Sequence, residues 1–471
     1  MTSERADLVI LGSGPAGLAA AREAVTLGLS TVLVEAAELG GTCLNRGCIP
    51  TKLFLGATVA AAELRAQARL RVAQGEERLD LEVLHHRTRQ IVEGTRAATA
   101  KDLAKAGVEL VQGRGRLLGP GQVEISCGPE GQSPRTLSCG HCVVATGSRP
   151  AMLPEAVFRC EIAPGTLERA VLTSDDLLRL DTIPRSLLVI GAGAIGLEMA
   201  EFWSRLGTKI ILVEALDRPA PAEDPEAGQT LARMLKREGW DLRLGQRVTS
   251  LVDCGTEAAC VLASGATISA EKALVAIGRR ANSENLGLES VRATMTGGGF
   301  VTTDAFLRAG ERAYAVGDVN GRTLLEHAAA HQARYAVRHL AGGTVAAYDP
   351  GPMPACVYGT HEVRRAGAMP EALKAVHPDL AGSVQVSRAA LVANPIAQAH
   401  GATQGFIKVA WLRDKVAGVL AVGHGVSHLA TQASLLVVEG YDLRKVEELV
   451  FAHPSLDEAL EAALRAPREA A

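Results

Sequence analysis

Two cysteines, Cys43 and Cys48, lie five residues apart in a glycine-rich segment. Five residues of a regular helix turn through about 500°, so these side chains would not share a helical face. A disulfide between them would need a distorted helix, which Gly47 and Pro50 favour. Because a strained disulfide is more easily reduced, the spacing suits a redox relay. The alternative interpretation is a pair of reduced, buried thiols.

Near the C-terminus, His453 and Glu458 are candidates for a base and its orienting carboxylate. Thiol–disulfide exchange proceeds through a thiolate, so a base must take the substrate's proton. A histidine titrates near ~6.5, and a carboxylate on its other ring nitrogen would fix its tautomer and raise its basicity. Two alternatives stay open. Ser455 and Glu458 match a capping box, and His453 could be an ordinary turn residue before Pro454.

An internal repeat predicts the elements that position this chemistry. Residues 8–35 and 187–214 each contain an apolar strand, a G-x-G-x-x-G turn, a helix and a second strand that ends in an acid. In such a turn the glycines allow a tight bend, close approach to a pyrophosphate and helix packing. The helix N-terminus then favours phosphate. We therefore predict two nucleotide-binding modules rather than βαβ units that bind nothing. The residues concerned are Gly12, Gly14, Gly17 and Glu35, then Gly191, Gly193, Gly196 and Glu214.

The two modules differ in the nucleotide and the chemistry that they predict. Glu214 suits the free 2′-hydroxyl of NAD and repels a 2′-phosphate, and Gly196 also matches the NAD fingerprint. Arg218 nearby leaves weak NADP use open. The cysteine pair follows the first module, whereas the second is followed by no cysteine until Cys254. The first module should therefore carry the redox chemistry.

Composition excludes several other classes of protein. The chain has 471 residues, of which 47% are hydrophobic, and a net charge of −3 with scattered basic residues, which argues against a nucleic-acid partner. The most apolar stretch, 187–203, holds three glycines and Glu198, so we expect no membrane span. Residues 1–7 lack a charged-then-apolar pattern and a small-residue cleavage site, so we expect no leader. Nine cysteines do not suggest a disulfide scaffold, and we expect a cytoplasmic protein.

Two further patterns are discounted. Cys139 and Cys142 have thioredoxin-like spacing but lead into an apolar strand rather than a helix N-terminus. His327 and His331 are four residues apart, but a metal would need a third ligand that the sequence does not identify. We therefore expect no metal site.

The segment Gly40–Lys52, with the sequence GGTCLNRGCIPTK, and the closing His453–Glu458 resemble the class I pyridine nucleotide-disulfide oxidoreductases. Within that family the chain is most similar to the dihydrolipoamide dehydrogenases, from Leu8 to about Arg465. The resemblance implies an α/β fold with two tandem Rossmann-like domains, for FAD and NAD, and a C-terminal α+β dimerisation domain. The implied ranges are 1–150 and 281–348 for the FAD domain, 151–280 for the NAD domain and 349–471 for the dimerisation domain.

The resemblance also implies a role for each residue at the FAD site. The first-module glycines and Glu35 would hold the ADP half of FAD. Thr146 and Gly147 would line the path of the flavin nucleotide, and Asp318 would bind the ribityl chain. Lys52 would lie near the flavin ring, although by itself it reads equally well as a solvated helix charge.

Further roles concern the redox centre. Lys52 would pair with Glu198, Cys48 would lie nearer the flavin, and Cys43 would exchange with the substrate. The dyad of His453 with its glutamate would reach across a homodimer to the partner chain's disulfide. The implied reaction is oxidation of dihydrolipoamide by NAD through FAD, with a lipoyl protein or a small dithiol as partner.

Three departures from the family pattern lie in the C-terminal domain that would shape the approach of the substrate. Val450–Phe451 replaces more polar residues, His428 replaces a common glutamate, and Asn394–Ala397 replaces a segment that usually carries an arginine. They leave open an NAD(P)H-dependent reductase of another disulfide, a quinone or a metal substrate. A third hypothesis is a scaffold role, which the joint presence of both cysteines and the dyad disfavours.

Overall fold

The computed structural model describes residues 5–75, 78–126, 134–160, 169–343 and 345–471. The chain divides into two compact units. Unit 1 contains residues 1–52, 85–151 and 279–350, and unit 2 contains residues 53–84, 152–278 and 351–471. Across the described ranges, no helix is both long and apolar enough to cross a membrane.

Unit 1 is built on a largely parallel sheet centred on β1 (Arg5–Leu11). β1 pairs in parallel with β2 (Thr31–Glu35) and with β6 (Arg135–Val144), and β2 pairs with β3 (Glu109–Gln112). The apolar run of β1 is continuous because both faces of the sheet are covered. The other strands of this unit are β4 (Arg114–Gly119), β5 (Gln122–Ser126), β7 (Ser148–Pro150), β17 (Arg279–Ala281), β18 (Arg308–Gly310) and β19 (Ala313–Ala315).

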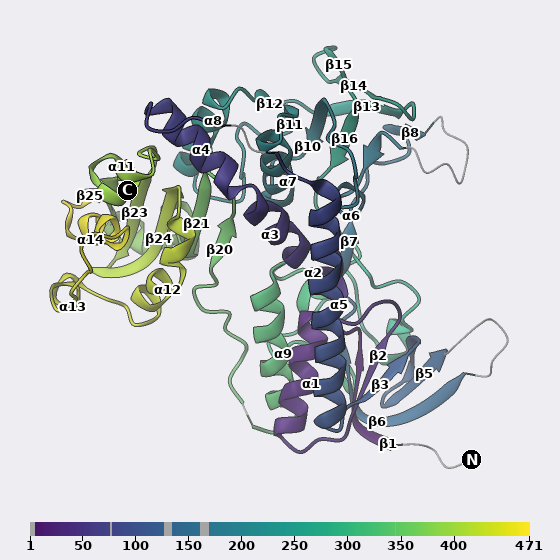
Figure 1. Cartoon of the computed structure of the whole chain (residues 1–471). Helices are drawn as coiled ribbons and strands as arrows, with labels where there is room; N and C mark the ends of the chain where they lie inside the picture. Colours follow the sequence, from purple (N-terminus) through teal and green to yellow (C-terminus); the bar gives the residue numbers. More distant parts are fainter. Residues whose placement is uncertain (1–4, 76–77, 127–133, 161–168, 344) are drawn as a thin grey trace. The chain divides into compact units, whose positions relative to one another are not determined.

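Alanine-rich helices cover one face of this sheet. α1 (Pro15–Thr26) and α9 (Glu326–Leu340) lie side by side (Figure 1), and α5 (Leu81–Lys105) contributes Leu103 to the same core. Alanines at the α1–α9 contact allow the helix axes to approach closely, which a bulky aromatic side chain would prevent. The low aromatic content of the chain, 3%, agrees with this kind of core.

Unit 2 contains a second parallel sheet, in the order β12-β11-β10-β16-β9. β10 (Ser186–Ile190), α7 (Ala194–Arg205) and β11 (Lys209–Glu214) repeat the arrangement of β1, α1 and β2. The other elements of this region are β8 (Phe158–Cys160), β9 (Val171–Leu172), α6 (Ser174–Leu177), α8 (Pro225–Arg237), β12 (Asp241–Leu244), β13 (Val248–Asp253), β14 (Ala258–Leu262), β15 (Thr267–Ala270) and β16 (Lys272–Val275).

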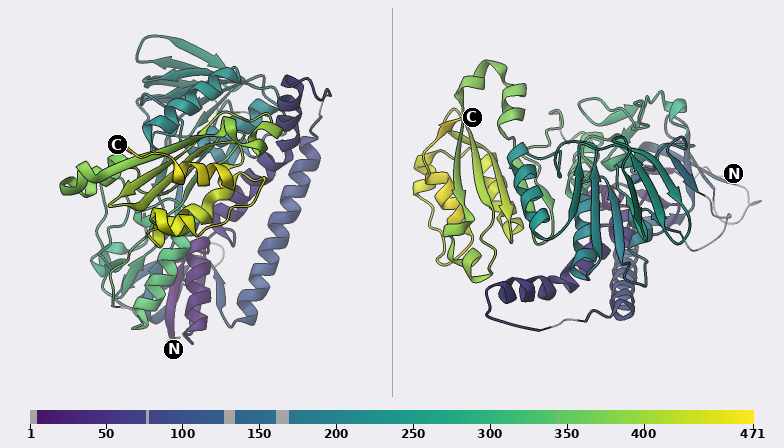
Figure 2. Two further views of the ribbon diagram at one scale, coloured as in Figure 1. Left: turned by 90° about the vertical axis from the view of Figure 1, so that its left-hand side faces the viewer. Right: turned by 90° about the horizontal axis from the view of Figure 1, so that it is seen from above.

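The C-terminal part of unit 2 is an antiparallel sheet in the order β20-β21-β24-β23-β22-β25. Its long central strands are β23 (Phe406–Leu412) and β24 (Lys415–Gly423), and α12 (Ala430–Val438) and α14 (Asp457–Arg465) pack against the sheet (Figure 2). The predicted fold class, two Rossmann-like domains and an α+β domain, is confirmed. The remaining elements here are β20 (Ala355–Val357), β21 (Glu362–Gly367), α10 (Pro370–Val376), β22 (Val384–Ala390), α11 (Pro395–Ala399), α13 (Leu443–Glu447) and β25 (Glu469–Ala470).

Three helices follow β2 in sequence and lead from unit 1 into unit 2. α2 (Gly41–Arg46) belongs to unit 1, α3 (Cys48–Ala57) begins there, and α4 (Val59–Arg69) belongs to unit 2. Residues 53–84 therefore fold with unit 2, although they precede the second nucleotide module in the chain.

Candidate active site

The first glycine turn joins β1 to α1 by a close backbone approach. Gly12 has a φ of +99°, and a Cβ on Gly17 would lie 1.8 Å from the carbonyl oxygen of Gly12. A Cβ on Gly14, by contrast, would meet no atom within 4 Å. The turn thus leaves open space in front of the N-terminus of α1, where backbone N–H groups favour a phosphate.

Glu35 stabilises this turn from the end of β2. Its carboxylate accepts hydrogen bonds from the Ser13 backbone N–H (2.8 Å) and hydroxyl (2.6 Å), and from the Ala37 N–H (2.7 Å). The side chain is 8% exposed. The acid therefore lies beside the turn, at the position where a ribose would be bound in a dinucleotide fold.

The second turn reproduces this geometry. Gly191 has a φ of +103°, and a Cβ on Gly196 would lie 2.0 Å from the Gly191 carbonyl oxygen. Gly193 again faces open space, and Glu214 accepts the Ala192 N–H at 2.8 Å. The residues at both turns therefore fit the two nucleotides that the sequence predicts.

The helix distortion predicted between the cysteines is present. α2 ends before Gly47, whose φ of −134° and ψ of −115° are not helical, and α3 begins at Cys48. A Cβ on Gly47 would lie 2.9 Å from the Thr42 carbonyl oxygen, so glycine is required at this break. The break brings the side chains of Cys43 and Cys48 within hydrogen-bond contact.

This contact makes the two thiols unequal. The hydrogen bond to Cys48 raises the pKa of Cys43, and burial raises it further. The same hydrogen bond lowers the pKa of Cys48, with a further lowering from the Lys52 ammonium group. Cys48 is therefore the favoured thiolate of the reduced pair, and Cys43 retains the proton.

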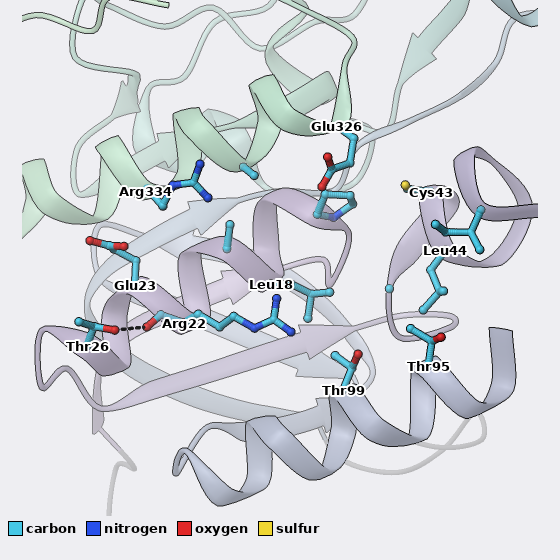
Figure 3. A pocket seen from close by; sticks show the side chains of 15 residues that line it. Leu18, Arg22, Glu23, Thr26, Cys43, Leu44, Thr95, Thr99, Glu326 and Arg334 are labelled. Atoms are coloured by element: carbon cyan, nitrogen blue, oxygen red, sulfur yellow. Dashed lines mark hydrogen bonds between the residues drawn. The ribbon is translucent and has the colours of Figure 1, made fainter. Parts of the chain in front are cut away.

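A cavity of about 450 Å³ reaches Cys43 from the surface of unit 1. It lies between α1 and α9, and Figure 3 shows Cys43 and Glu326 at one end and Arg334 and Glu23 farther along. Glu326, which begins α9, raises the pKa of both cysteines through its negative charge. No sequence motif marks Glu326, and only the packing of α9 on α1 brings it to the cysteines.

The predicted flavin contacts Thr146, Gly147 and Asp318 lie in one connected region of unit 1. Thr146 donates its hydroxyl hydrogen bond to the Asn282 carbonyl oxygen (2.6 Å), and Gly147 has a φ of +70°. The Ser148 hydroxyl donates to the Asp318 carboxylate at 2.5 Å. The turn after β6 is thereby held against the loop of Asp318.

Lys52 and Glu198 belong to different units. Lys52 lies one helical turn after Cys48 on α3. Glu198 lies on α7, is 8% exposed, and accepts the Tyr358 N–H at 3.1 Å.

His453 and Glu458 form the expected contact. The Nδ1 of His453 lies 2.8 Å from one carboxylate oxygen of Glu458, and the other oxygen accepts the Ser455 N–H at 3.0 Å. Both bonds lower the pKa of Glu458, and the bond to His453 has the larger effect. Glu458 therefore orients the histidine and also accepts the Ser455 N–H. The predicted capping box is only half formed, because the Ser455 hydroxyl donates to the Ala452 carbonyl oxygen and the N-cap of the last helix is Leu456.

Asn394 holds the loop that carries this dyad. Its side-chain amide donates to the Ser455 carbonyl oxygen (2.8 Å), while its oxygen accepts the N–H groups of Ile396 and Ala397. The side chain is buried at 5% exposure. The segment that departs from the family pattern at 394–397 thus has a positioning role, which the sequence analysis did not identify.

Cys139 and Cys142 lie within β6 and are both buried. Burial raises the pKa of Cys139 to about 11 and raises that of Cys142 well above its ordinary value. Burial therefore disfavours the thiolate form of both cysteines.

Comparison with known proteins covers nearly the whole chain. Residues 6–334 match the model of the pyridine nucleotide-disulphide oxidoreductases, and residues 353–464 match the dimerisation domain of the same family. The chain is 33% identical to dihydrolipoyl dehydrogenase of Bacillus subtilis, over 98% of both proteins. It is also 33% identical to dihydrolipoyl dehydrogenase of Pseudomonas aeruginosa, over 98% of this chain and 97% of that protein.

Two solved structures have the same fold. LpdA from Mycobacterium tuberculosis superposes with a TM-score of 0.86 at 27% identity, covering 98% of this chain and 99% of LpdA. The flavoprotein disulfide reductase RclA from Escherichia coli has a TM-score of 0.83 at 21% identity, with coverage of 98% and 99%. The likeness to RclA concerns the fold alone.

The glycine turns generate a paired prediction. Gly17→Ala should abolish retention of FAD. Gly196→Ala should retain FAD, but NADH should no longer reduce the flavin. The reason is that each added Cβ would collide with a backbone carbonyl oxygen in one of the two turns only. Flavin absorbance after gel filtration and anaerobic NADH titration measure the two effects. Gly94→Ala, in α5 with no atom within 4 Å of its Cβ, is the control. Loss of FAD from both turn variants alike would contradict the assignment.

Glu326 generates a second prediction. Glu326→Gln should lower the pKa of the reactive thiol in the reduced enzyme, because removal of a nearby negative charge favours the thiolate. The pH profile of iodoacetamide alkylation should shift to lower pH. Glu23→Gln is the matched control, since Glu23 lines the same cavity but pairs with Arg338 at 2.6 Å. Equal profiles for Glu326→Gln and the wild type would refute the coupling.

Proposed function

We propose that this chain is a dihydrolipoamide dehydrogenase that passes electrons through FAD to NAD⁺. The chain belongs to the pyridine nucleotide-disulphide oxidoreductase family, whose members supply this chemistry. The observation that carries this proposal is the hydrogen-bonded pair Cys43 and Cys48 at a helix break, at the end of an open cavity. The proteins named dihydrolipoyl dehydrogenase that match the chain over nearly its full length support the choice of substrate.

The first half of the reaction is a thiol–disulfide exchange. In the oxidised enzyme a substrate thiolate attacks the sulfur of Cys43, the Cys43–Cys48 bond breaks, and Cys48 leaves as a thiolate. A low thiol pKa makes Cys48 the better leaving group. The second substrate thiol then attacks the mixed disulfide, which releases oxidised lipoamide and leaves two electrons on the cysteine pair.

His453 is the base in this proposal. Because its Nδ1 contacts Glu458, Nε2 is the nitrogen that takes a proton from the substrate thiol. The Glu458 carboxylate stabilises the imidazolium that results. His453 is 75% exposed on its own chain. A homodimer would bring it to the partner's cysteines, and the match to a dimerisation domain supports that assembly.

The two nucleotides complete the electron path. When bound, FAD would supply the two-electron carrier between the reduced cysteines and NAD⁺. The net reaction converts the dithiol and NAD⁺ into the disulfide, NADH and a proton. We assign the first turn and Glu35 to FAD, and the second turn and Glu214 to NAD. Lys52 would stabilise negative charge near the flavin, with Glu198 as its partner.

The remaining assignments belong to the same proposal. The FAD domain comprises residues 1–150 and 281–348, the NAD domain 151–280, and the dimerisation domain 349–471. The cavity of about 450 Å³ that reaches Cys43 supports a dithiol substrate, which a lipoyl protein would present. The cysteine usage of the chain supports a cytoplasmic location as part of this proposal.

The decisive assay is anaerobic mixing of the FAD-loaded enzyme with dihydrolipoamide and NAD⁺. We expect rapid NADH formation, and its loss by at least about 10³-fold in Cys43→Ser, because the exchange then lacks its attacked sulfur. Cys139→Ser, at a buried thiol outside the site, is the matched control. If NADH still reduces the flavin but dihydrolipoamide is not turned over, the lipoyl substrate is rejected and another disulfide acceptor is favoured.

Glu458→Gln separates the electrostatic role of Glu458 toward the base from its hydrogen bond to the Ser455 backbone. The amide oxygen can still accept the Ser455 N–H, but the negative charge that stabilises the imidazolium is lost. We expect kcat to fall by roughly 10²-fold with little change in thermal stability. Stopped-flow reduction by dihydrolipoamide measures the first effect and thermal unfolding the second. If the fall in kcat is matched by a comparable loss of folded protein, Glu458 has a purely structural role.

A further inference from the structure

Three potential metal ligands meet in unit 2, away from the redox cysteines in sequence. Glu63 lies on α4, His400 directly follows α11, and His424 directly follows β24. One ligand atom from each lies within 4.8 Å of the other two. The Nδ1 of His400 is 3.9 Å from the Glu63 carboxylate, and the rings of His400 and His424 are 5.5 Å apart. These residues form no local sequence motif, so the expectation of no metal site did not take them into account.

The three ligands are carried by elements that are already tied together. The Gln67 amide of α4 donates to the carbonyl oxygen of Ala399, the residue before His400, at 2.9 Å. Arg65 donates to the Arg205 carbonyl oxygen at 2.6 Å, and Arg69 pairs with Glu238 at 2.8 Å. Yet no residue of α4 is buried. This helix is therefore held at the cluster by polar contacts rather than by a hydrophobic face.

His424 is prepared to act as a ligand. Its Nδ1 is buried and has no hydrogen-bond partner among the residues that the structure describes. A buried ring nitrogen that no described protein group satisfies is an observation that points to a missing ligand.

We propose that Glu63, His400 and His424 bind one divalent transition-metal ion of the Zn²⁺ class. Two imidazole nitrogens and one carboxylate oxygen are a familiar ligand set for zinc, with water in the fourth position. Bonds of about 2.0–2.1 Å place tetrahedral donors roughly 3.4 Å apart, so the donors must close by about 1 Å. Glu63 and His400 are exposed and can make this adjustment by side-chain rotation.

The neighbouring positive charge does not oppose binding strongly. Arg205 is nearly buried and is neutralised by Glu201 at 3.1 Å. Its remaining donors bond Leu55, Thr58 and Thr360. The carboxylate of Glu63 then supplies the negative charge that attracts the cation.

Metal binding would fasten α4 to the C-terminal sheet. The ion would link a helix from residues 53–84 to two loops of the C-terminal region, so it would cross-link segments within unit 2. A ligand that binds only the folded state raises stability, so the expected signature is a metal-dependent rise in Tm. This inference does not depend on the substrate of the enzyme.

The test uses tag-free, FAD-loaded protein in a Cys43→Ala/Cys48→Ala background, because the two thiols are competing metal ligands. Equilibrium dialysis with Zn²⁺ should give one ion per chain. His424→Ala and His400→Ala should each weaken binding by at least about tenfold and remove the Zn²⁺-dependent rise in Tm. The visible spectrum of bound Co²⁺ should report a tetrahedral nitrogen–oxygen site that both variants lose.

Two further variants keep the test decisive. His86→Ala, at an exposed histidine of α5, should bind Zn²⁺ like the parent. Glu63→Gln removes the carboxylate at an exposed position, so weakened binding there cannot be attributed to misfolding. Absence of stoichiometric Zn²⁺ binding, or binding unchanged in both Glu63→Gln and His400→Ala, would overturn the proposal.

Discussion

The architecture depends on a backbone contact that excludes a side chain. At each nucleotide turn, the carbonyl oxygen of the first glycine occupies the space that a Cβ on the third glycine would need. That Cβ would lie 1.8 Å from the oxygen at Gly17 and 2.0 Å from it at Gly196. This contact sets how closely the helix approaches the strand, and hence where its N-terminal N–H groups point. The acid that ends the neighbouring strand accepts N–H groups of the same turn, so strand, helix and acid form one rigid unit.

The redox centre uses glycine for a different purpose. Gly47 interrupts what would otherwise be a continuous helix, and this interruption brings Cys43 and Cys48 into contact. Once in contact, the thiols become unequal, because their hydrogen bond raises the pKa of Cys43 and lowers that of Cys48. The Lys52 ammonium group reinforces the bias toward a Cys48 thiolate. The asymmetry thus comes from the placement of two cysteines and a cation within one short segment of chain.

Much of the fold and of the candidate site could be predicted from the sequence, because the residues that determine them lie close together in the chain. The glycine turns, the acids that follow them and the distortion at Gly47 all lie within a few dozen residues, where spacing alone limits the geometry. The pairing of His453 with Glu458 was predictable for the same reason, since they are five residues apart.

What the sequence did not reveal depends on contacts between distant segments. Glu326 reaches the cysteines only because α9 packs on α1. Asn394 supports the dyad through a bond to Ser455 that no periodicity indicates. The grouping of residues 53–84 with unit 2, and the meeting of Glu63 with His400, likewise require tertiary packing.

The difference in pKa between the Cys43 and Cys48 thiols has a consequence for oxidative damage. Peroxide attacks thiolates in preference to thiols, so Cys48 is the sulfur that would be converted to a sulfenic acid. Cys43 retains its thiol within contact distance and can displace water from that sulfenic acid. The product is the Cys43–Cys48 disulfide, which is the oxidised form from which the proposed exchange begins. Accidental oxidation therefore ends in a state that the next catalytic cycle uses, rather than in an irreversible sulfinic acid.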